Sequence, residues 1–136
     1  MRFVGIFLNA ELRTGGQRRL LELYESLAER GNVVTVLMND RLAYEPRFFR
    51  AERVSCRYRK GSGYPVSASY RASVARAIRE RPDLCARHDV ILIHGETSLG
   101  AALLLKRVYG LPVLFGLRSN AVREALVSLT APDRTP

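Results

Sequence analysis

Short apolar runs that end at a polar residue alternate with helical patterns along the whole chain, and this alternation constrains the fold most strongly. Each run is too short for a helix and is apolar at consecutive positions, as strands buried on both faces are. These runs are residues 3–8, 33–38, 90–93 and 112–117. Helical spacing of apolar residues fills residues 20–30, 66–81, 99–109 and 121–129. Such an alternation is typical of an α/β protein.

The middle of the chain is less regular. Residues 41–50 predict a helix broken around Pro46, and residues 54–58 predict a short third strand. Residues 60–65 contain two glycines and a proline, which predicts a loop. In the first helix the apolar stripe leaves the other faces to the acidic residues Glu22, Glu25 and Glu29.

Parallel strands joined by right-handed crossovers predict a Rossmann-like, doubly wound parallel sheet of about five strands, with helices on both faces and the order 3-2-1-4-5. The 136 residues suit one domain over residues 1–129, followed by a tail or linker over residues 130–136. Apolar types make up 47% of the chain and charged types 26%, a balance that excludes a disordered or collagen-like chain.

The composition also argues against membrane spans and metal sites. No run reaches the roughly 18 apolar residues of a membrane span. The two cysteines, Cys56 and Cys85, form no CxxC motif, and the chain has only two histidines. We expect a cytoplasmic protein with no metal site and no bound cofactor.

In a sheet of this order, ligands bind beyond the carboxyl ends of the strands, where the chain reverses direction between strands 1 and 4. The loops at that point are residues 9–17 and 94–98, with residues 118–120 beside them. These segments are polar and glycine-rich, so the candidate site lies here.

The pair Gly15 and Gly16 comes just before the first predicted helix. Without side chains the backbone can approach a ligand closely, and the free N–H groups of a first helical turn favour an anion. The alternative is a tight turn that binds nothing. The pair fits neither GxGxxG nor a P-loop.

Four further residues are candidates at this edge. His94 can exchange protons or hydrogen bonds with a hydroxyl-rich ligand, or it can simply end a strand. Glu96 can bond ligand hydroxyls or favour the start of the next helix. Arg118 can hold a phosphate or carboxylate, or it can be a solvated loop residue. Ser119, beside it, suits an N-cap or a sugar contact.

The net charge of +9 is concentrated in residues 41–60, where seven basic residues stand against two acidic ones. Aromatic residues lie between them, a combination that serves anionic membrane surfaces or nucleic acid. The alternative is a solvated face with its aromatic side chains in the core. No nucleic-acid reading motif is present, so we expect no nucleic-acid partner.

Several segments together resemble the amino-terminal domain of family-4-like glycosyltransferases of the GT-B fold. Residues 14–19 (TGGQRR) are similar to that family's GGxxr, and residues 20–36 (LLELYESLAERGNVVTV) to its leLaxxLaxrGHeVtv. Residues 89–94 (DVILIH) are similar to DVIHAH, and residues 110–115 (GLPVLF) to GIPVVyt. The resemblance covers most of the chain and is weakest at residues 41–88.

The resemblance implies two Rossmann-like domains facing each other, the amino-terminal one holding the acceptor and the carboxy-terminal one the nucleotide-diphosphate sugar. Carried over, Gly15 and Gly16 approach the donor phosphates, and His94, Glu96, Arg118 and Ser119 contact the sugar or acceptor. His94 matches the second His of the strand-4 motif, with Leu92 at the place of the first. Arg118 stands where the family usually has a His.

The resulting hypothesis is the acceptor-side domain of a retaining, metal-independent glycosyltransferase. It is expected to be inactive without a carboxy-terminal donor-binding domain, because the chain reaches only Pro136. Implied partners are a sugar or lipid-linked acceptor and an anionic surface at the inner membrane face. The alternative is a non-catalytic binding or interaction module of the same fold, since fold does not fix function.

Overall fold

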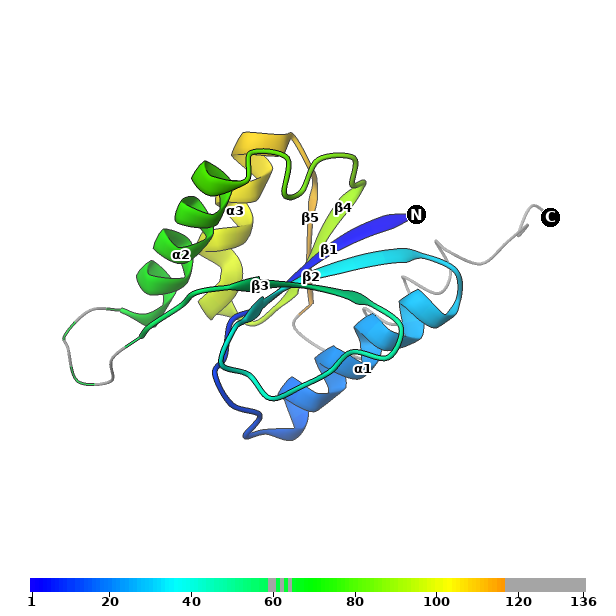
Figure 1. Cartoon of the computed structure of the whole chain (residues 1–136), viewed down its shortest axis with the longest axis horizontal. Helices are drawn as coiled ribbons and strands as arrows, with labels where there is room; N and C mark the ends of the chain where they lie inside the picture. Colours follow the sequence, from blue (N-terminus) through cyan, green and yellow to red (C-terminus); the bar gives the residue numbers. More distant parts are fainter. Residues whose placement is uncertain (59–60, 62, 64, 117–136) are drawn as a thin grey trace.

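Five parallel strands form one sheet in the order β3-β2-β1-β4-β5, as predicted (Figure 1). The computed structural model describes residues 1–58, 61, 63 and 65–116. The strands are β1 (Arg2–Phe7), β2 (Val33–Asn39), β3 (Arg50–Val54), β4 (Val90–His94) and β5 (Val113–Gly116). The helices are α1 (Gly15–Glu29), α2 (Val66–Glu80) and α3 (Leu99–Tyr109), with a short 3-10 turn, η1 (Glu96–Ser98). The predicted helix 121–129 and tail 130–136 lie outside the described residues.

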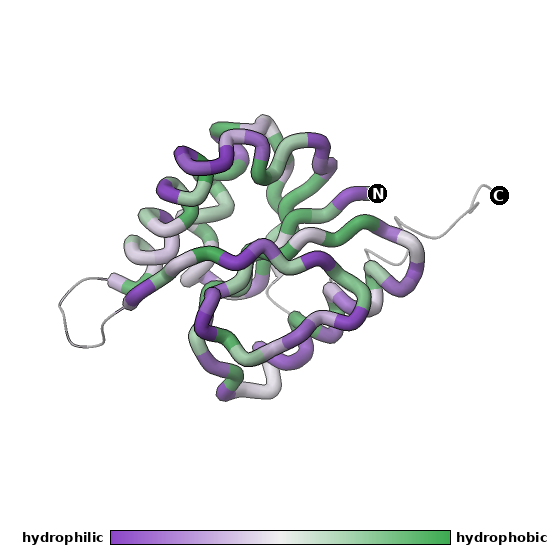
Figure 2. The backbone as a smooth tube through the Cα atoms, in the orientation of Figure 1, coloured by the Kyte–Doolittle hydropathy of each residue, from purple (hydrophilic) through white to green (hydrophobic). Residues whose placement is uncertain are grey.

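One face of the sheet is covered by α1 and the other by α2 and α3 (Figure 1). The side chains of β1 alternate between the two layers: Phe3 and Phe7 pack with α1, and Val4 and Ile6 pack with α2 and α3. The central strands are hydrophobic along most of their length (Figure 2). This double burial explains why their sequences read as continuous apolar runs, and it confirms the predicted α/β class.

The first helix begins at Gly15, earlier than predicted, so Gly15 and Gly16 are helical and not part of a turn. Thr14 is the N-cap: its hydroxyl accepts a hydrogen bond from the Gln17 N–H (3.2 Å), and the Gln17 side chain accepts one from the Thr14 N–H (3.3 Å). This reciprocal capping box has a readable sequence signature, Thr-x-x-Gln. At the other end Gly31 follows the C-cap residue Arg30 and has φ +98°, a left-handed conformation that favours glycine after a helix.

Two predictions for the middle of the chain are wrong. No helix forms in residues 41–50, and the third strand is Arg50–Val54, four residues before the predicted one. β3 lies at the edge of the sheet and carries Arg50, Glu52 and Arg53. Edge strands tolerate charged side chains, so a search for apolar runs passes over them.

Residues 41–49 are instead organised around a buried carboxylate from α1. Glu25, predicted to lie on a polar face, is 3% exposed. It accepts hydrogen bonds from the N–H groups of Arg47 (2.8 Å), Phe48 (2.9 Å) and Phe49 (3.2 Å), and from the Tyr44 hydroxyl (3.0 Å). Burial by itself would raise the pKa of Glu25, but together these hydrogen bonds outweigh it and hold the pKa below its ordinary value.

The carbonyl groups of the same segment are bound by a cation from β3. The Arg53 guanidinium donates to the carbonyl oxygens of Asn39 (3.1 Å) and Leu42 (3.0 Å), and also to that of Tyr44. Glu25 and Arg53 thus satisfy the N–H and C=O groups that a helix would have used. The segment therefore folds as an ordered loop.

The contact between α1 and β1 is close at Gly5. Tyr24 is fully buried, and its hydroxyl donates to the Leu92 carbonyl oxygen of β4 at 2.7 Å. A Cβ atom added at Gly5 would lie 2.7 Å from Cε1 and from Oη of Tyr24. Any side chain at Gly5 would therefore displace the Tyr24 ring.

We expect Gly5→Ala to lower the free energy of unfolding by about 3 kcal/mol, because the ring must move and its buried hydrogen bond is lost. Gly100→Ala is the matched control: its Cβ would meet only Cδ of Arg71, at 3.8 Å, within a helix. That variant should be unchanged or up to about 1 kcal/mol more stable. Urea denaturation measures both, and equal stabilities would contradict the close contact.

We expect Glu25→Gln to lower the free energy of unfolding by about 2 kcal/mol at pH 7, since charge-assisted hydrogen bonds become neutral or are lost. Folding lowers the pKa of Glu25, so its stabilisation is complete well above the ordinary value of 4.5. It is lost as the pH falls through 4.5 and then through the lower folded-state value.

The exposed neighbour Glu22→Gln serves as the control and should change stability by less than about 0.5 kcal/mol. Denaturation curves between pH 3 and 7 should be flatter for Glu25→Gln than for the wild type. Parallel pH dependence of the two proteins would show that Glu25 is not the titrating group.

Candidate functional site

A cavity of about 340 Å³ opens beyond the carboxyl ends of β1, β2 and β3. Its buried lining consists of Leu8, Asn39, Cys56 and Tyr70. The rest of its wall is mostly polar and comes from the segment after β1, the first turn of α1, the residues following β2 and β3, and the start of α2. These lining residues are Asn9, Ala10, Glu11, Arg13, Gln17, Arg41, Tyr58 and Val66.

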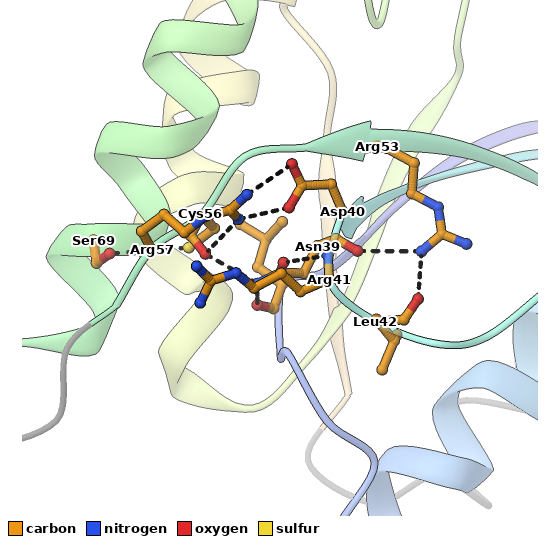
Figure 3. Close-up of polar contacts among 9 residues, drawn as sticks. Asn39, Asp40, Arg41, Leu42, Arg53, Cys56, Arg57 and Ser69 are labelled. Carbon is orange, nitrogen blue, oxygen red and sulfur yellow. Dashed lines mark hydrogen bonds and ion pairs between the residues drawn. The ribbon is translucent and has the colours of Figure 1, made fainter.

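Asn39, at the end of β2, connects the segments that form the buried lining of the cavity, which we call its floor (Figure 3). Its side-chain amide donates to the carbonyl oxygens of Leu8 (3.0 Å) and Cys56 (3.2 Å), and its amide oxygen accepts from the Arg41 N–H (2.9 Å). The segments that follow β1, β2 and β3 are therefore fixed by one side chain that is 2% exposed. In the sequence Asn39 is only the polar residue that follows the apolar run at residues 33–38.

Among the arginines beside the cavity floor, two are paired with carboxylates of the described residues and one is not. Arg57 binds Asp40 through two hydrogen bonds, Nη1–Oδ1 at 2.6 Å and Nη2–Oδ2 at 3.2 Å (Figure 3). This contact with the guanidinium holds the pKa of Asp40 below its ordinary value. Arg13 pairs with Glu11 at 2.8 Å. The exposed Arg41 guanidinium has no hydrogen bond or ion pair within the part of the chain that the structure describes, so it is available to an anion.

Tyr70 of α2 contributes a phenol to the cavity. Burial raises its pKa to about 12, so the hydroxyl remains protonated and can donate a hydrogen bond at any physiological pH. Around this cavity the chain presents phenol, amide and guanidinium groups. These are suited to a ligand that carries hydroxyl groups and negative charge.

Gly15 and Gly16 form the first turn of α1, beside Gln17 of the cavity wall. A Cβ at Gly15 would lie 3.7 Å from Nη2 of Arg19, and one at Gly16 would lie 3.9 Å from the Thr14 hydroxyl oxygen. Neither has the positive φ of Gly31. Backbone geometry and packing would therefore accept other residues at both positions. Arg19, which the sequence did not single out, donates to the Gly15 carbonyl oxygen at 3.3 Å.

His94 lies on the other side of the α1 N-terminus. It lines a space of about 10 Å³ together with Gly16, Leu20 and Gly116. The structure thus brings Gly16 and His94 together, as predicted for the point between β1 and β4. That point itself is nearly filled, because Leu20 and Leu23 of α1 also line the space against Leu92. The larger cavity lies to the side, over β2 and β3.

The remaining predicted site residues are Glu96, Arg118 and Ser119. Glu96 is exposed in η1, and its side chain has no ion pair or hydrogen bond with another described residue. It follows Gly95, whose φ of +88° turns the chain out of β4. Arg118 and Ser119 lie outside the described residues.

Most basic side chains in the described part of the basic segment, residues 41–58, are paired. Four of its arginines pair with carboxylates: Arg47 with Glu25, Arg50 with Glu52, Arg53 with Glu45 and Arg57 with Asp40. Two of these carboxylates, Glu25 and Asp40, come from outside the segment. A count of charges within residues 41–60 omits these two carboxylates. It therefore overstates the unpaired positive charge of the segment.

Within residues 1–58, 61, 63 and 65–116, no group of three His, Cys, Asp or Glu side chains is placed to hold a metal ion. No helix there is both long enough and apolar enough to cross a bilayer.

Comparison with solved structures extends the description of the fold. MurG of Acinetobacter baumannii matches with a TM-score of 0.54 and 13% identity, over 91% of this chain and 38% of the MurG chain. The C-terminal domain (residues 83–215) of the PF1911 hydrogenase from Pyrococcus furiosus matches with a TM-score of 0.56 and 15% identity. This match covers 85% of this chain and 90% of that domain. At these identities the likeness is one of fold. The chain spans well under half of MurG.

Comparison with curated proteins gives no match. The pattern that defines Glycosyltransferase Family 4, in contrast, matches residues 13–131. That range begins one residue before the Thr14 cap and contains the glycine pair, His94 and four of the five strands. The predicted resemblance is confirmed: this chain belongs to glycosyltransferase family 4.

Proposed function

We propose that the chain is the acceptor-side domain of a retaining glycosyltransferase that uses a nucleotide-diphosphate sugar. The observation that carries the proposal is the lack of tight packing around the Cβ positions of Gly15 and Gly16. Neither backbone conformation nor packing requires glycine there. A ligand that approaches the backbone closely would require it. The family membership supplies the reaction class, and the retaining course comes from the resemblance.

The group proposed at the glycine pair is the donor diphosphate. Unpaired N–H groups and the positive end of the helix dipole favour an anion at the start of α1. Arg19 adds a guanidinium in the same turn. As diphosphate departs, its growing negative charge would be stabilised by these groups. Arg118 and Ser119, which follow β5 in the chain, remain proposed contacts to the donor.

The two spaces at this edge suggest how the substrates are arranged. Gln17 lines the 340 Å³ cavity, and Gly16 lines the small space beside His94. We assign the acceptor to the larger cavity. The transferred sugar is assigned to the surface outside His94 and Glu96, because the space next to Gly16 is nearly filled. An acceptor hydroxyl oxygen then bonds to the anomeric carbon, the bond to the diphosphate oxygen breaks, and the hydroxyl proton leaves with the diphosphate.

This half-site needs a carboxy-terminal donor-binding domain to hold the nucleotide. A lipid-linked acceptor is one class that the polar cavity could serve through its sugar or phosphate headgroup. No metal or cofactor enters the proposed reaction.

We expect pyrophosphate, added at millimolar concentration, to shift the amide NMR signals of Gly15 and Gly16 in the 136-residue chain. Gly16→Val should weaken this binding at least roughly tenfold, because its methyl groups occupy the approach to the N–H groups. The fold should persist, since valine is no worse than glycine in a helix. Gly100→Val, at the second position of α3, is the control and should bind pyrophosphate as the wild type does.

Unchanged pyrophosphate affinity in a folded Gly16→Val chain would show that the glycines serve only the start of the helix. That result would favour the alternative, a non-catalytic module of the same fold.

We expect the 136-residue chain alone to transfer no sugar, because half of the proposed site is supplied by another domain. Mass spectrometry of reactions with a panel of nucleotide sugars and simple acceptors would detect products. Turnover by the chain alone would contradict the two-domain site. The pyrophosphate titration tests the glycine pair independently of this outcome.

A further inference from the structure

A groove of about 350 Å³, which we call the α1 groove, lies between α1 and the connection from β2 to β3. Figure 1 shows this connection running beside α1. The residues that line the groove are Leu12, Arg18, Leu21, Glu22, Tyr44, Glu45 and Arg47. None of them lines the cavity assigned to the acceptor or the space beside His94. The α1 groove is therefore a separate space, to which the proposed reaction assigns no ligand.

The Tyr44 ring is fixed in the wall of this groove. It stacks on the Phe49 ring with a centroid distance of 6.1 Å and an angle of 11° between the planes. Its hydroxyl donates to the buried Glu25 carboxylate at 3.0 Å. Burial and this hydrogen bond raise the pKa of Tyr44 to about 12, so the hydroxyl remains a donor at physiological pH. A ligand need not order this half-buried ring on binding, which lowers the entropic cost.

The charged groups of the α1 groove balance each other. Arg18 and Glu22 lie one turn apart on α1, and their side chains form no ion pair or hydrogen bond with another described residue. The opposite wall carries Glu45 and Arg47, whose ion pairs with residues outside the groove are long, at 3.8 and 3.7 Å. Guanidinium groups only donate hydrogen bonds, and carboxylates only accept them. The ligand that matches both kinds of group is neutral and carries hydroxyl groups, which donate and accept.

The α1 groove adjoins the acceptor cavity. Leu12 lines the groove, whereas its neighbours Glu11 and Arg13 line the cavity. In the same way Gln17 lines the cavity and Arg18 lines the groove. Consecutive Cα atoms are about 3.8 Å apart, so the rim between the two spaces is one residue wide. A ligand seated in the cavity can therefore continue into the groove.

We propose that the α1 groove is a second carbohydrate subsite, which holds the next sugar residue of an acceptor that has at least two. The C–H groups of the sugar pack on the Tyr44 ring, because they carry a slight positive charge and the face of the ring is negative. The sugar hydroxyls bond to the guanidinium and carboxylate groups of both walls. The inference rests on the proposed function, because it takes the larger cavity as the acceptor site. It narrows the acceptor class to disaccharides and longer glycans.

The lining of the groove argues against an anion or a peptide as its ligand. An anion would be repelled by the carboxylates of Glu22 and Glu45 as strongly as the guanidinium groups attract it. Bound peptides add a strand to a sheet edge or place an apolar helix face in an apolar groove. The α1 groove is bounded by a helix and a loop, and four of its seven lining residues are charged.

Amide NMR titration of the 136-residue chain tests the proposal. The probes are maltose, cellobiose, lactose and chitobiose, each compared with the monosaccharides that compose it. At millimolar concentrations we expect at least one disaccharide to shift the amide signals of Glu22 and Glu45. That disaccharide should bind at least about tenfold more tightly than its monosaccharides, because only its second ring reaches the groove.

Two pairs of variants locate the binding. Tyr44→Ala should lower the disaccharide affinity roughly tenfold, to that of a monosaccharide, whereas Tyr44→Phe, which keeps the ring, should retain most of it. Glu22→Ala should weaken disaccharide binding roughly fivefold through the lost hydrogen bonds. Glu29→Ala is the matched control, since Glu29 is exposed on the same helix but does not line the groove. Circular dichroism verifies that each variant is folded.

No shift of the groove signals with any of the four disaccharides, equal affinity for disaccharides and monosaccharides, or equal losses in Glu22→Ala and Glu29→Ala would each overturn the inference. The pyrophosphate titration monitors Gly15 and Gly16 separately. A chain that binds pyrophosphate there but no disaccharide in the groove refutes this inference alone. Disaccharide binding in the groove without pyrophosphate binding refutes the proposed donor site and leaves the carbohydrate subsite standing.

Discussion

The position of α1 depends on one buried contact, the Tyr24 ring against Gly5 with its hydroxyl bonded to the Leu92 carbonyl oxygen. Complete burial raises the pKa of this phenol well above its ordinary value, so the hydroxyl stays a donor. The contact joins α1 to β1 and β4 at once. Since the same helix begins with Gly15 and Gly16, the contact also sets where the glycine pair lies relative to His94.

A buried carboxylate and a partly buried guanidinium extend this arrangement to the edge of the sheet. Glu25, one residue after Tyr24, binds three backbone N–H groups of the loop before β3, and Arg53 of β3 binds three carbonyl groups of the segment from Asn39 to Tyr44. Full hydrogen bonding offsets the cost of removing these groups from water. A long connection is thereby held in one conformation, and it delivers Arg41 to the cavity wall.

The residues proposed to bind substrates all lie at the carboxyl edge of the sheet or beside it, along α1. The carboxyl edge provides a polar cavity, a glycine pair and His94, all anchored by Asn39 and α1. The outward side of α2 and α3, in contrast, carries one exposed leucine, Leu103, beside the basic side chains of Arg71 and Arg107. α2 contributes to both, because Tyr70 lines the cavity and Arg71, the next residue, lines a groove between α2 and α3.

By itself the sequence determined the class of fold, the strand order and the family. Doubly buried strands read as apolar runs, and short local signals such as Gly31 and the TGGQRR motif mark the ends of elements. Only the tertiary structure decided the course of residues 41–58. There the stabilising partners, Glu25 with Phe48 and Arg53 with Leu42, are far apart in sequence, and no local pattern records such pairs. For the same reason, the sequence located the glycine pair and His94 but missed the cavity floor at Asn39 and Tyr70. It could count the charges of the chain, whereas their pairing, and hence which surface keeps free charge, is a property of the fold.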